Sequence, residues 1–353
     1  MKKIKKTTKQ DFITYLAVIA AFVILTVMSD AGMLSRALKG QLVPICCYIV
    51  MAVSLNLTVG ILGELSLGHA GFMSVGAFSG IIATMSLQTA VPSPVLRLVI
   101  ALVVGAAFAA AAGALIGIPV LRLRGDYLAI VTLAFGEIIK ELINCLIVGV
   151  DSEGLHIIFN VTGAKTVNDL HMLEGGRAII KGAQGATGTE TIASFTAGFI
   201  LIMVSLVIIL NLIRSRSGRA IMALRDNRIA AESVGINVTT YKMMAFVISA
   251  ALAGAAGALY GLNFSNLAST KFNFNTSILV LVFVVLGGLG NIRGSIIAAA
   301  ILTVLPELLR SFADYRMLVY AIVLILVMLG TNNAQIKALF AKLVPSQLRK
   351  EAK

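Results

Sequence analysis

Residues 42–87 read LVPICCYIVMAVSLNLTVGILGELSLGHAGFMSVGAFSGIIATMSL, and Glu64 is the only formally charged side chain among them. A helix needs roughly 20 predominantly apolar residues to cross the hydrocarbon core of a bilayer. This stretch is long enough for two such helices, which we place at Leu42–Leu57 and Leu65–Leu87. Glycines interrupt the apolar pattern around their junction. The stretch therefore predicts an integral membrane protein.

The composition of the whole chain agrees with this interpretation. Of 353 residues, 58% are hydrophobic and 13% are charged. Soluble domains contain about 45–50% apolar residues, glycine included, and about 25% charged residues. The net charge is +13, but the basic residues lie between apolar runs, as the positive-inside rule predicts for membrane proteins. We therefore expect lipid, and not nucleic acid, around this chain.

Similar apolar runs recur along the sequence and predict an all-α polytopic membrane protein with about ten transmembrane helices. The first run is longer than the roughly 7–15 apolar residues of a signal peptide, so we expect it to be retained as a helix. Some of the later runs are short, which predicts short or broken helices. The expected spans are Phe12–Met28, Leu42–Leu57, Leu65–Leu87, Val95–Val120, Tyr127–Val148, Thr191–Ile213, Met243–Leu262, Thr276–Leu289, Ser295–Leu309 and Met317–Leu329.

The basic residues predict the orientation of these spans. Alternate connections, together with the two termini, carry 19 of the 29 lysines and arginines, and the intervening connections carry the other ten. Cytoplasmic segments are enriched in basic residues, so we expect both termini in the cytoplasm and an even number of spans. Ten spans fit, and eight fit if two short runs are re-entrant. Residues 1–353 then form a single transmembrane domain, with 149–190 an external loop region and 214–242 a cytosolic loop.

The segment Ser217–Gly235 reads SGRAIMALRDNRIAAESVG and is too charged to cross the bilayer. It consists of helix-forming residues, with Ser217 expected as the N-cap and Gly235 as the C-cap. Arg228 and Glu232 are four residues apart, a spacing that stabilises a helix. Two interpretations are open on these grounds: a helix that inserts into a groove on another protein, or a solvated basic helix.

The longer run RSGRAIMALRDNRIAAESVGINV, residues 216–238, resembles the cytosolic loop of ABC importer permeases of the branched-chain amino acid type. Its part AAESVG resembles the short E-A-A…G signature of importer permeases. The resemblance implies a coupling helix that docks on an ATPase subunit. The residues that match the motif, or lie in its basic flank, are Arg219, Arg225, Ala230, Ala231, Glu232 and Gly235. No Leu-Pro follows Gly235, so the match is to the branched-chain group rather than to importers at large.

Three more stretches are similar to the same family. They are NLTVGILGELSLGHAGFMSVG at 56–76, LRLRGDYLAIVTLAFGE at 121–137 and LGGLGNIRG at 286–294. Together they favour the LivM-like type of the two permeases that this family pairs. The resemblance implies a path for leucine, isoleucine and valine across a bacterial-type plasma (inner) membrane. It also implies a companion permease in a heterodimer, two ABC ATPase subunits and an extracytoplasmic solute-binding protein. An ABC permease for urea or a simple sugar is the alternative.

The sequence contains no G-x-x-x-x-G-K-[ST] motif, which forms the phosphate-binding loop of many ATP-binding proteins. We therefore expect a transport subunit rather than an enzyme, with no cofactor or metal bound by this chain and with ATP on partner subunits. A membrane-embedded enzyme would need a catalytic constellation, and we find none in the sequence.

Polar residues inside spans usually face a bundle interior or a transport path. Glu137, Lys140, Glu141 and Asn144 fall on one stripe of a helix. This stripe faces either the path or a neighbouring subunit, or it makes structural contacts within the bundle. His69 fits either a proton relay of an ion-coupled secondary transporter or a hydrogen-bonded packing residue. Asn56 and Ser66 complete the candidate path residues.

Glycine-interrupted apolar segments occur once in each half of the chain. The glycines are Gly60, Gly63, Gly68 and Gly71 in the first half, and Gly287, Gly288, Gly290 and Gly294 in the second. Broken helices in corresponding halves of transporters often line the substrate path. Small residues also permit close helix packing. We expect packing for the G-x-x-x-G pairs, namely Gly76/Gly80, Gly113/Gly117 and Gly257/Gly261.

Overall fold

The computed structural model describes residues 6–88, 90–121, 126–151, 154–160, 166–173, 176–309, 321–322 and 325. Internal contacts divide the chain into two compact units, residues 1–300 and residues 301–353. Most of the predicted span Met317–Leu329, the basic C-terminal tail, Arg122 and Arg124 lie outside the described residues.

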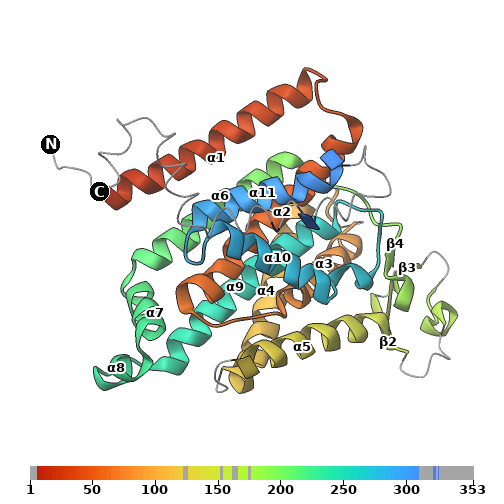
Figure 1. Ribbon diagram of the computed structural model, residues 1–353. Helices are drawn as coiled ribbons and strands as arrows, with labels where there is room; N and C mark the ends of the chain where they lie inside the picture. The colour runs from red at the N-terminus through yellow and green to blue at the C-terminus, as the bar shows by residue number, and fades with distance from the viewer. Residues whose placement is uncertain are drawn as a thin grey trace. The chain divides into compact units, whose positions relative to one another are not determined.

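Helices dominate the described residues (Figure 1), and each of the first nine predicted spans overlaps one of them. Within the part of the chain that the structure describes, five helices are long and apolar enough to cross a bilayer, at Phe12–Asp30, Arg36–Leu62, Pro94–Val120, Phe195–Arg214 and Val238–Gly261. The helices are α1 Lys6–Asp30, α2 Arg36–Asn56, α3 His69–Ser86, α4 Pro94–Val120, α5 Asp126–Asn144, α6 Phe195–Arg214, α7 Arg216–Asp226, α8 Arg228–Ser233, α9 Val238–Gly261, α10 Phe274–Gly287 and α11 Ile292–Leu308. The π-helical turn η1, Leu57–Leu62, continues α2, and the 3-10 turn η4, Ser269–Phe272, precedes α10.

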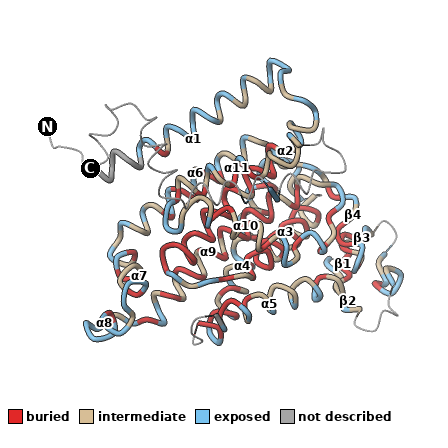
Figure 2. Tube along the Cα trace, in the orientation of Figure 1, coloured by how far each residue is buried: buried red, intermediate tan, exposed pale blue. Residues whose placement is uncertain are grey.

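The core lies where α2, α3, α4 and α9 pack together, and these helices carry much of the buried surface in Figure 2. A methyl group added at Gly76 would overlap the carbonyl of Gly254, and one at Gly257 would overlap the carbonyl of Met73. The backbones of α3 and α9 therefore touch at these glycines. This confirms the packing interpretation of Gly76 and Gly257.

Helix α1 differs from the core helices because its apolar side chains are exposed. Phe12 is 67% exposed and Val27 is 61% exposed. Such a surface is stable against lipid tails, in which apolar side chains lose nothing by exposure. Arg293 ties this helix to the start of α11, since its Nε donates to the Thr14 hydroxyl at 2.6 Å.

The all-α prediction holds for most of the described residues, but these also include a five-stranded antiparallel sheet, which was not predicted. Its strand order is β2-β1-β3-β4-β5. The strands are β1 Leu146–Val150, β2 Leu155–Phe159, β3 Arg177–Lys181, β4 Ala186–Thr187 and β5 Asn266–Leu267. Four of them lie in or beside the polar segment 149–190.

The predicted span Tyr127–Val148 is therefore too long. Helix α5 ends at Asn144, and β1 begins two residues later with the sequence LIVGV. A short apolar run cannot distinguish a buried strand from the end of a helix. Ile147, Val148 and Val150 are β-branched and favour the strand, and Ile147 and Val148 are buried between β2 and β3.

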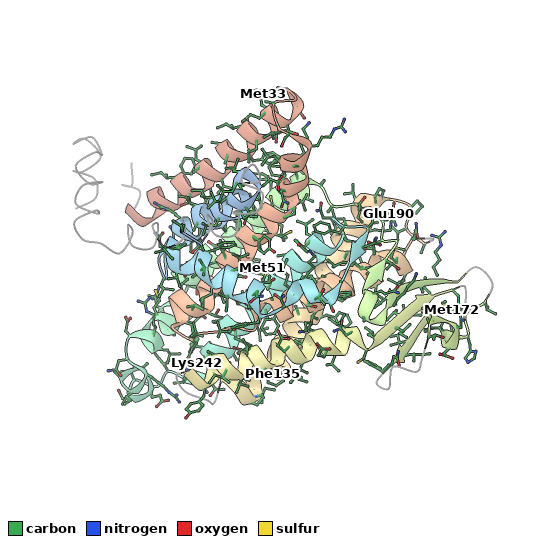
Figure 3. The ribbon with its side chains drawn as sticks, turned by 45° about the vertical axis from the view of Figure 1, so that its right-hand side comes forward. Met33, Met51, Phe135, Met172, Glu190 and Lys242 are labelled. Carbon is green, nitrogen blue, oxygen red and sulfur yellow. The ribbon has the colours of Figure 1, made fainter. Side chains whose placement is uncertain are left out.

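The sheet and the α7–α8 pair lie at opposite ends of the helical bundle (Figure 1). Figure 3 shows the same separation, with Lys242 near the start of α9 at one end and Glu190 at the other. Each of the two long polar connections of the sequence thus forms structure at its own end of the bundle.

Candidate functional site

The segment predicted as one helix, Ser217–Gly235, forms two short helices, α7 and α8, which we call the elbow. The break lies at Asn227, whose backbone is extended and whose side chain accepts a hydrogen bond of 3.1 Å from the Ala230 N–H. Asparagine favours this capping role over a helix interior. The predicted N-cap is also wrong, because the Ser215 hydroxyl caps α7 by accepting from the Gly218 N–H at 3.0 Å.

The other end of the elbow lies where the sequence placed it. The N–H of Gly235 donates to the Glu232 carbonyl at 3.0 Å, and the N–H of Ile236 donates to the Ala231 carbonyl at 3.1 Å. This pair of bonds is the Schellman motif, in which a left-handed residue ends a helix. Arg228 and Glu232 form the expected ion pair at 3.1 Å.

The elbow has its own small apolar core, which fixes its two helices to the start of α9. Leu224, Ala231 and Val238 are buried together, one from each helix. Ile236 and Tyr241 pack against them. The predicted docking residue Ala231 therefore faces inward, whereas Ala230, Glu232 and Arg219 are exposed.

The most exposed apolar side chains of the elbow were not among the predicted site residues. Ile229 is 79% exposed and Val234 is 74% exposed, the first within α8 and the second directly after it. Their exposure depends on how α7, α8 and α9 pack, which local spacing does not reveal.

Arg225 was predicted to belong to the basic flank of a docking motif, but it reaches toward the bundle. Its Nη1 donates to the Gly60 carbonyl in the η1 turn at 2.9 Å. Its aliphatic stem crosses Gly63, where an added Cβ would lie 2.6 Å from the Arg225 Cγ. Gly63 also has a left-handed backbone with φ of 82°, so this position favours glycine on two counts.

A second contact also joins the elbow end of the chain to the segment around the η1 turn. The Lys242 ammonium pairs with the Glu64 carboxylate, and their side chains are only 6% and 16% exposed. Lys242 lies in the first turns of α9, and Glu64 follows the η1 turn. The sequence placed these two residues 178 positions apart, with no motif that links them.

Asn56 lies at the junction of the two glycine-interrupted segments. Its Oδ1 accepts from the Gly290 N–H at 2.8 Å, and its Nδ2 donates to the Ser295 hydroxyl at 3.0 Å. A methyl group at Gly60 would overlap both the Asn56 Oδ1 and the Gly290 nitrogen. The two segments therefore meet, backbone against backbone, at Gly60 and Gly290.

His69 begins α3 and is almost fully buried. Its Nε2 lies 2.8 Å from the Ser54 hydroxyl, which itself donates to the Met51 carbonyl at 2.9 Å. Since that hydroxyl has one proton, His69 is the donor to Ser54. This arrangement fits a hydrogen-bonded packing residue between α2 and α3.

Ser66 lies in the connection between the η1 turn and α3, and its side chain is also buried. Within the described part of the chain, its hydroxyl has no hydrogen-bond partner. The neighbouring Leu67 N–H donates to the Thr132 hydroxyl of α5 at 3.1 Å. This connection is thus fixed by its backbone rather than by Ser66.

The polar stripe of α5 faces η4 and the start of α10. Lys140 pairs with Glu137 and lies 3.4 Å from Glu141. The Glu137 Oε1 accepts from the Phe274 N–H at 3.1 Å, and the Asn144 Oδ1 accepts from the Ser269 hydroxyl. Asn144 also donates to Glu141 at 3.0 Å. Glu137 and Asn144 therefore hold the η4 turn and the first residue of α10 against α5 through hydrogen bonds.

Long apolar helices that meet through small residues, with polar connections at the two ends, define a helical multi-pass membrane protein. Residues 37–328 match the family described as branched-chain amino acid transport system permease component. This chain belongs to that family.

Curated relatives agree with the family match. The high-affinity branched-chain amino acid transport system permease protein LivM of Salmonella typhimurium is 37% identical over 291 residues, or 80% of this chain and 66% of the relative. LivM of Escherichia coli K12 is 36% identical over 295 residues, with the same coverage. The permease protein LivH of Escherichia coli K12 is 34% identical over 117 residues, or 33% of this chain and 38% of the relative. The chain spans about two thirds of the length of the LivM relatives. No solved structure matches it.

Proposed function

We propose that this chain is the permease subunit of an ATP-driven ABC importer for branched-chain amino acids in the plasma (inner) membrane. Membership of the permease family supports the transport role. The names of the LivM and LivH relatives support the solute class, which comprises leucine, isoleucine and valine, and a companion permease.

The proposal includes a topology and a set of partners. The chain has ten spans with both termini in the cytoplasm, so that the elbow is cytosolic and the segment 149–190 is external. The positions of the elbow and the sheet at opposite ends of the bundle support this arrangement. Two ABC ATPases bind the elbows of the permease pair and hold the ATP, and an external solute-binding protein delivers the solute.

The observation that carries the proposal is the outer face of the elbow. Ile229 and Val234 are exposed at the end of the bundle opposite the sheet, and the elbow core holds α8, which contains Ile229 and is directly followed by Val234. Exposed apolar side chains on a rigid support are typical of a surface that a partner covers. The Arg228–Glu232 pair beside them adds charge that can orient that partner.

Copurification tests this docking role. The chain is expressed with its neighbouring genes, purified through a tag and examined for a bound ATPase. We expect Ile229→Asp and Glu232→Arg to lose the ATPase, while Ile229→Leu and Glu232→Gln retain it. The proposal fails if the wild-type chain never associates with an ATPase.

The solute is tested in proteoliposomes that contain the purified complex and the binding protein. Uptake of leucine, isoleucine and valine is compared with uptake of urea and a simple sugar, each with and without ATP. Preference for urea or sugar would make the chain an ABC permease for that solute instead. Uptake by the chain alone, driven by an ion gradient, would identify a secondary transporter.

A further inference from the structure

Arg225 and Lys242 both extend from the elbow end of the chain to the short segment Gly60–Glu64. We infer that these two residues form a two-point latch, Arg225 on Gly60 and Lys242 on Glu64, which makes the η1 turn move together with the elbow. The transport consequence of this inference rests on the proposed function. Its structural consequence does not, and can be tested on the chain alone.

The first point of the latch uses a carbonyl near the end of a π-helical turn. Helix ends leave backbone carbonyls that need a donor, and a charged donor gives a shorter and stronger bond than a neutral one. The Asp226 carboxylate lies 3.2 Å from Arg225 Nη2 and 3.3 Å from its Nε, which orients the guanidinium. Nη1 is then directed to Gly60.

The second point is an ion pair shielded from solvent. Lys242 and Glu64 are each mostly buried, so removal of one partner would leave the other charge uncompensated. Lys242 follows Val238 and Tyr241, which belong to the elbow core. Both points of the latch are therefore attached to one rigid unit.

The segment that the latch holds is the one that contacts the second half of the chain. Gly60 touches Gly290, and Asn56, directly before η1, holds the Gly290 N–H and the Ser295 hydroxyl. A displacement of the elbow thus reaches both glycine-interrupted segments through continuous contacts. π-Helical turns occur frequently at functional sites, and packed elements amplify small shifts into discrete changes.

Hydrogen exchange of the full chain in nanodiscs tests the structural part. Leu224→Ala loosens the elbow core and is predicted to raise exchange both in the elbow and at residues 57–68 by about tenfold. In a chain that also carries Arg225→Met, Lys242→Met and Glu64→Gln, the same substitution should loosen the elbow alone. Arg225→Met keeps an apolar stem over Gly63, and removes the donor to Gly60 together with the contacts to Asp226.

Two controls separate the latch from a general loss of stability. Arg228→Gln removes an ion pair that stays within the elbow, and should leave exchange at 57–68 unchanged. Swapping the two charges, with Glu64→Lys and Lys242→Glu in one chain, re-forms the ion pair. In that variant Leu224→Ala should again raise hydrogen exchange both in the elbow and at residues 57–68. The inference is overturned if 57–68 responds to Leu224→Ala equally with and without the latch, or if Arg228→Gln has the same effect as the latch substitutions.

The assembled transporter gives the functional readout. Complexes with the latch substitutions should assemble and hydrolyse ATP, but should move at least about tenfold less solute per ATP, because elbow motion no longer reaches the η1 turn. Unchanged transport per ATP would overturn the inference. Failure of the wild-type chain to bind any ATPase would instead overturn the proposed function, and the exchange result would still decide the structural inference.

Discussion

Asn56 and Ser295 are 239 residues apart in the chain, yet their side chains share a hydrogen bond of 3.0 Å in the buried centre of the bundle. Asn56 also accepts the Gly290 N–H, so a single side chain connects α2 to the α10–α11 connection.

Asn56→Ala should destabilise the protein by about 1–3 kcal/mol, because it removes a buried side chain that bonds both the Gly290 N–H and the buried Ser295 hydroxyl. Ser295→Ala should cost less, since it leaves a side-chain amide rather than a backbone group unpaired. The measurement is thermal unfolding in detergent. A matched control is Ser205→Ala, whose hydroxyl bonds only within its own helix, to the Leu201 carbonyl. An equal loss in Asn56→Ala and Ser205→Ala would contradict the prediction.

Gly60→Ala should be poorly tolerated, because the added methyl overlaps Asn56 and the backbone of Gly290. Forced overpacking typically costs about 1–3 kcal/mol and shifts the backbone. Gly40→Ala is the matched control, since a Cβ at Gly40 meets nothing within 4 Å. We expect a lower unfolding temperature for Gly60→Ala and an unchanged or higher one for Gly40→Ala. Similar yields and melting temperatures for both variants would show that the two segments are not in contact.

Glu137→Ala should reduce stability rather than alter solute selection, because Glu137 holds the first N–H of α10 and pairs with Lys140. The expected loss is about 0.5–1.5 kcal/mol, because the bond to Phe274 is partly open to solvent. Glu141→Gln, on the same stripe but with a side chain 64% exposed, should cost less than about 0.5 kcal/mol. Unfolding curves and the relative uptake of leucine and valine check this. A changed solute preference at normal stability would assign the stripe to the transport path.

His69→Gln should keep most of the transport rate, because His69 is buried and bonds a serine whose own proton is donated to the Met51 carbonyl. Glutamine can still donate to Ser54, so we expect a rate within about threefold of the wild type and a modest loss of stability. Uptake is measured with and without a proton gradient. Loss of transport that depends on this gradient would support the secondary-transporter interpretation of His69.

Many of the helices were predictable, because a long apolar run is what a helix needs to cross a bilayer. The first nine predicted spans each overlap a helix, and Gly235 ends the elbow as expected. Strand β1 was missed because Leu146–Val150 continues the apolarity of α5 without a charged residue or a proline between them. Periodicity cannot separate a helix end from a strand over so few residues.

The candidate site was harder to predict because its contacts join distant parts of the chain. Local spacing revealed the Arg228–Glu232 pair, but nothing near Lys242 points to Glu64. Arg225 was expected to face a partner protein, but it bonds to Gly60, which lies 165 residues away in the chain. Asn56 was predicted to line the transport path, and its bonds to Gly290 and Ser295 could not be inferred from the sequence.

The separate apolar core of the elbow has a practical consequence for protein engineering. Because Leu224, Ala231 and Val238 form a closed cluster, residues 215–242 constitute a transplantable cassette. Under the proposed function, moving this cassette into another permease should transfer the choice of ATPase. The recipient must supply an acidic residue and a glycine where this chain has Glu64 and Gly63, which Lys242 and Arg225 contact.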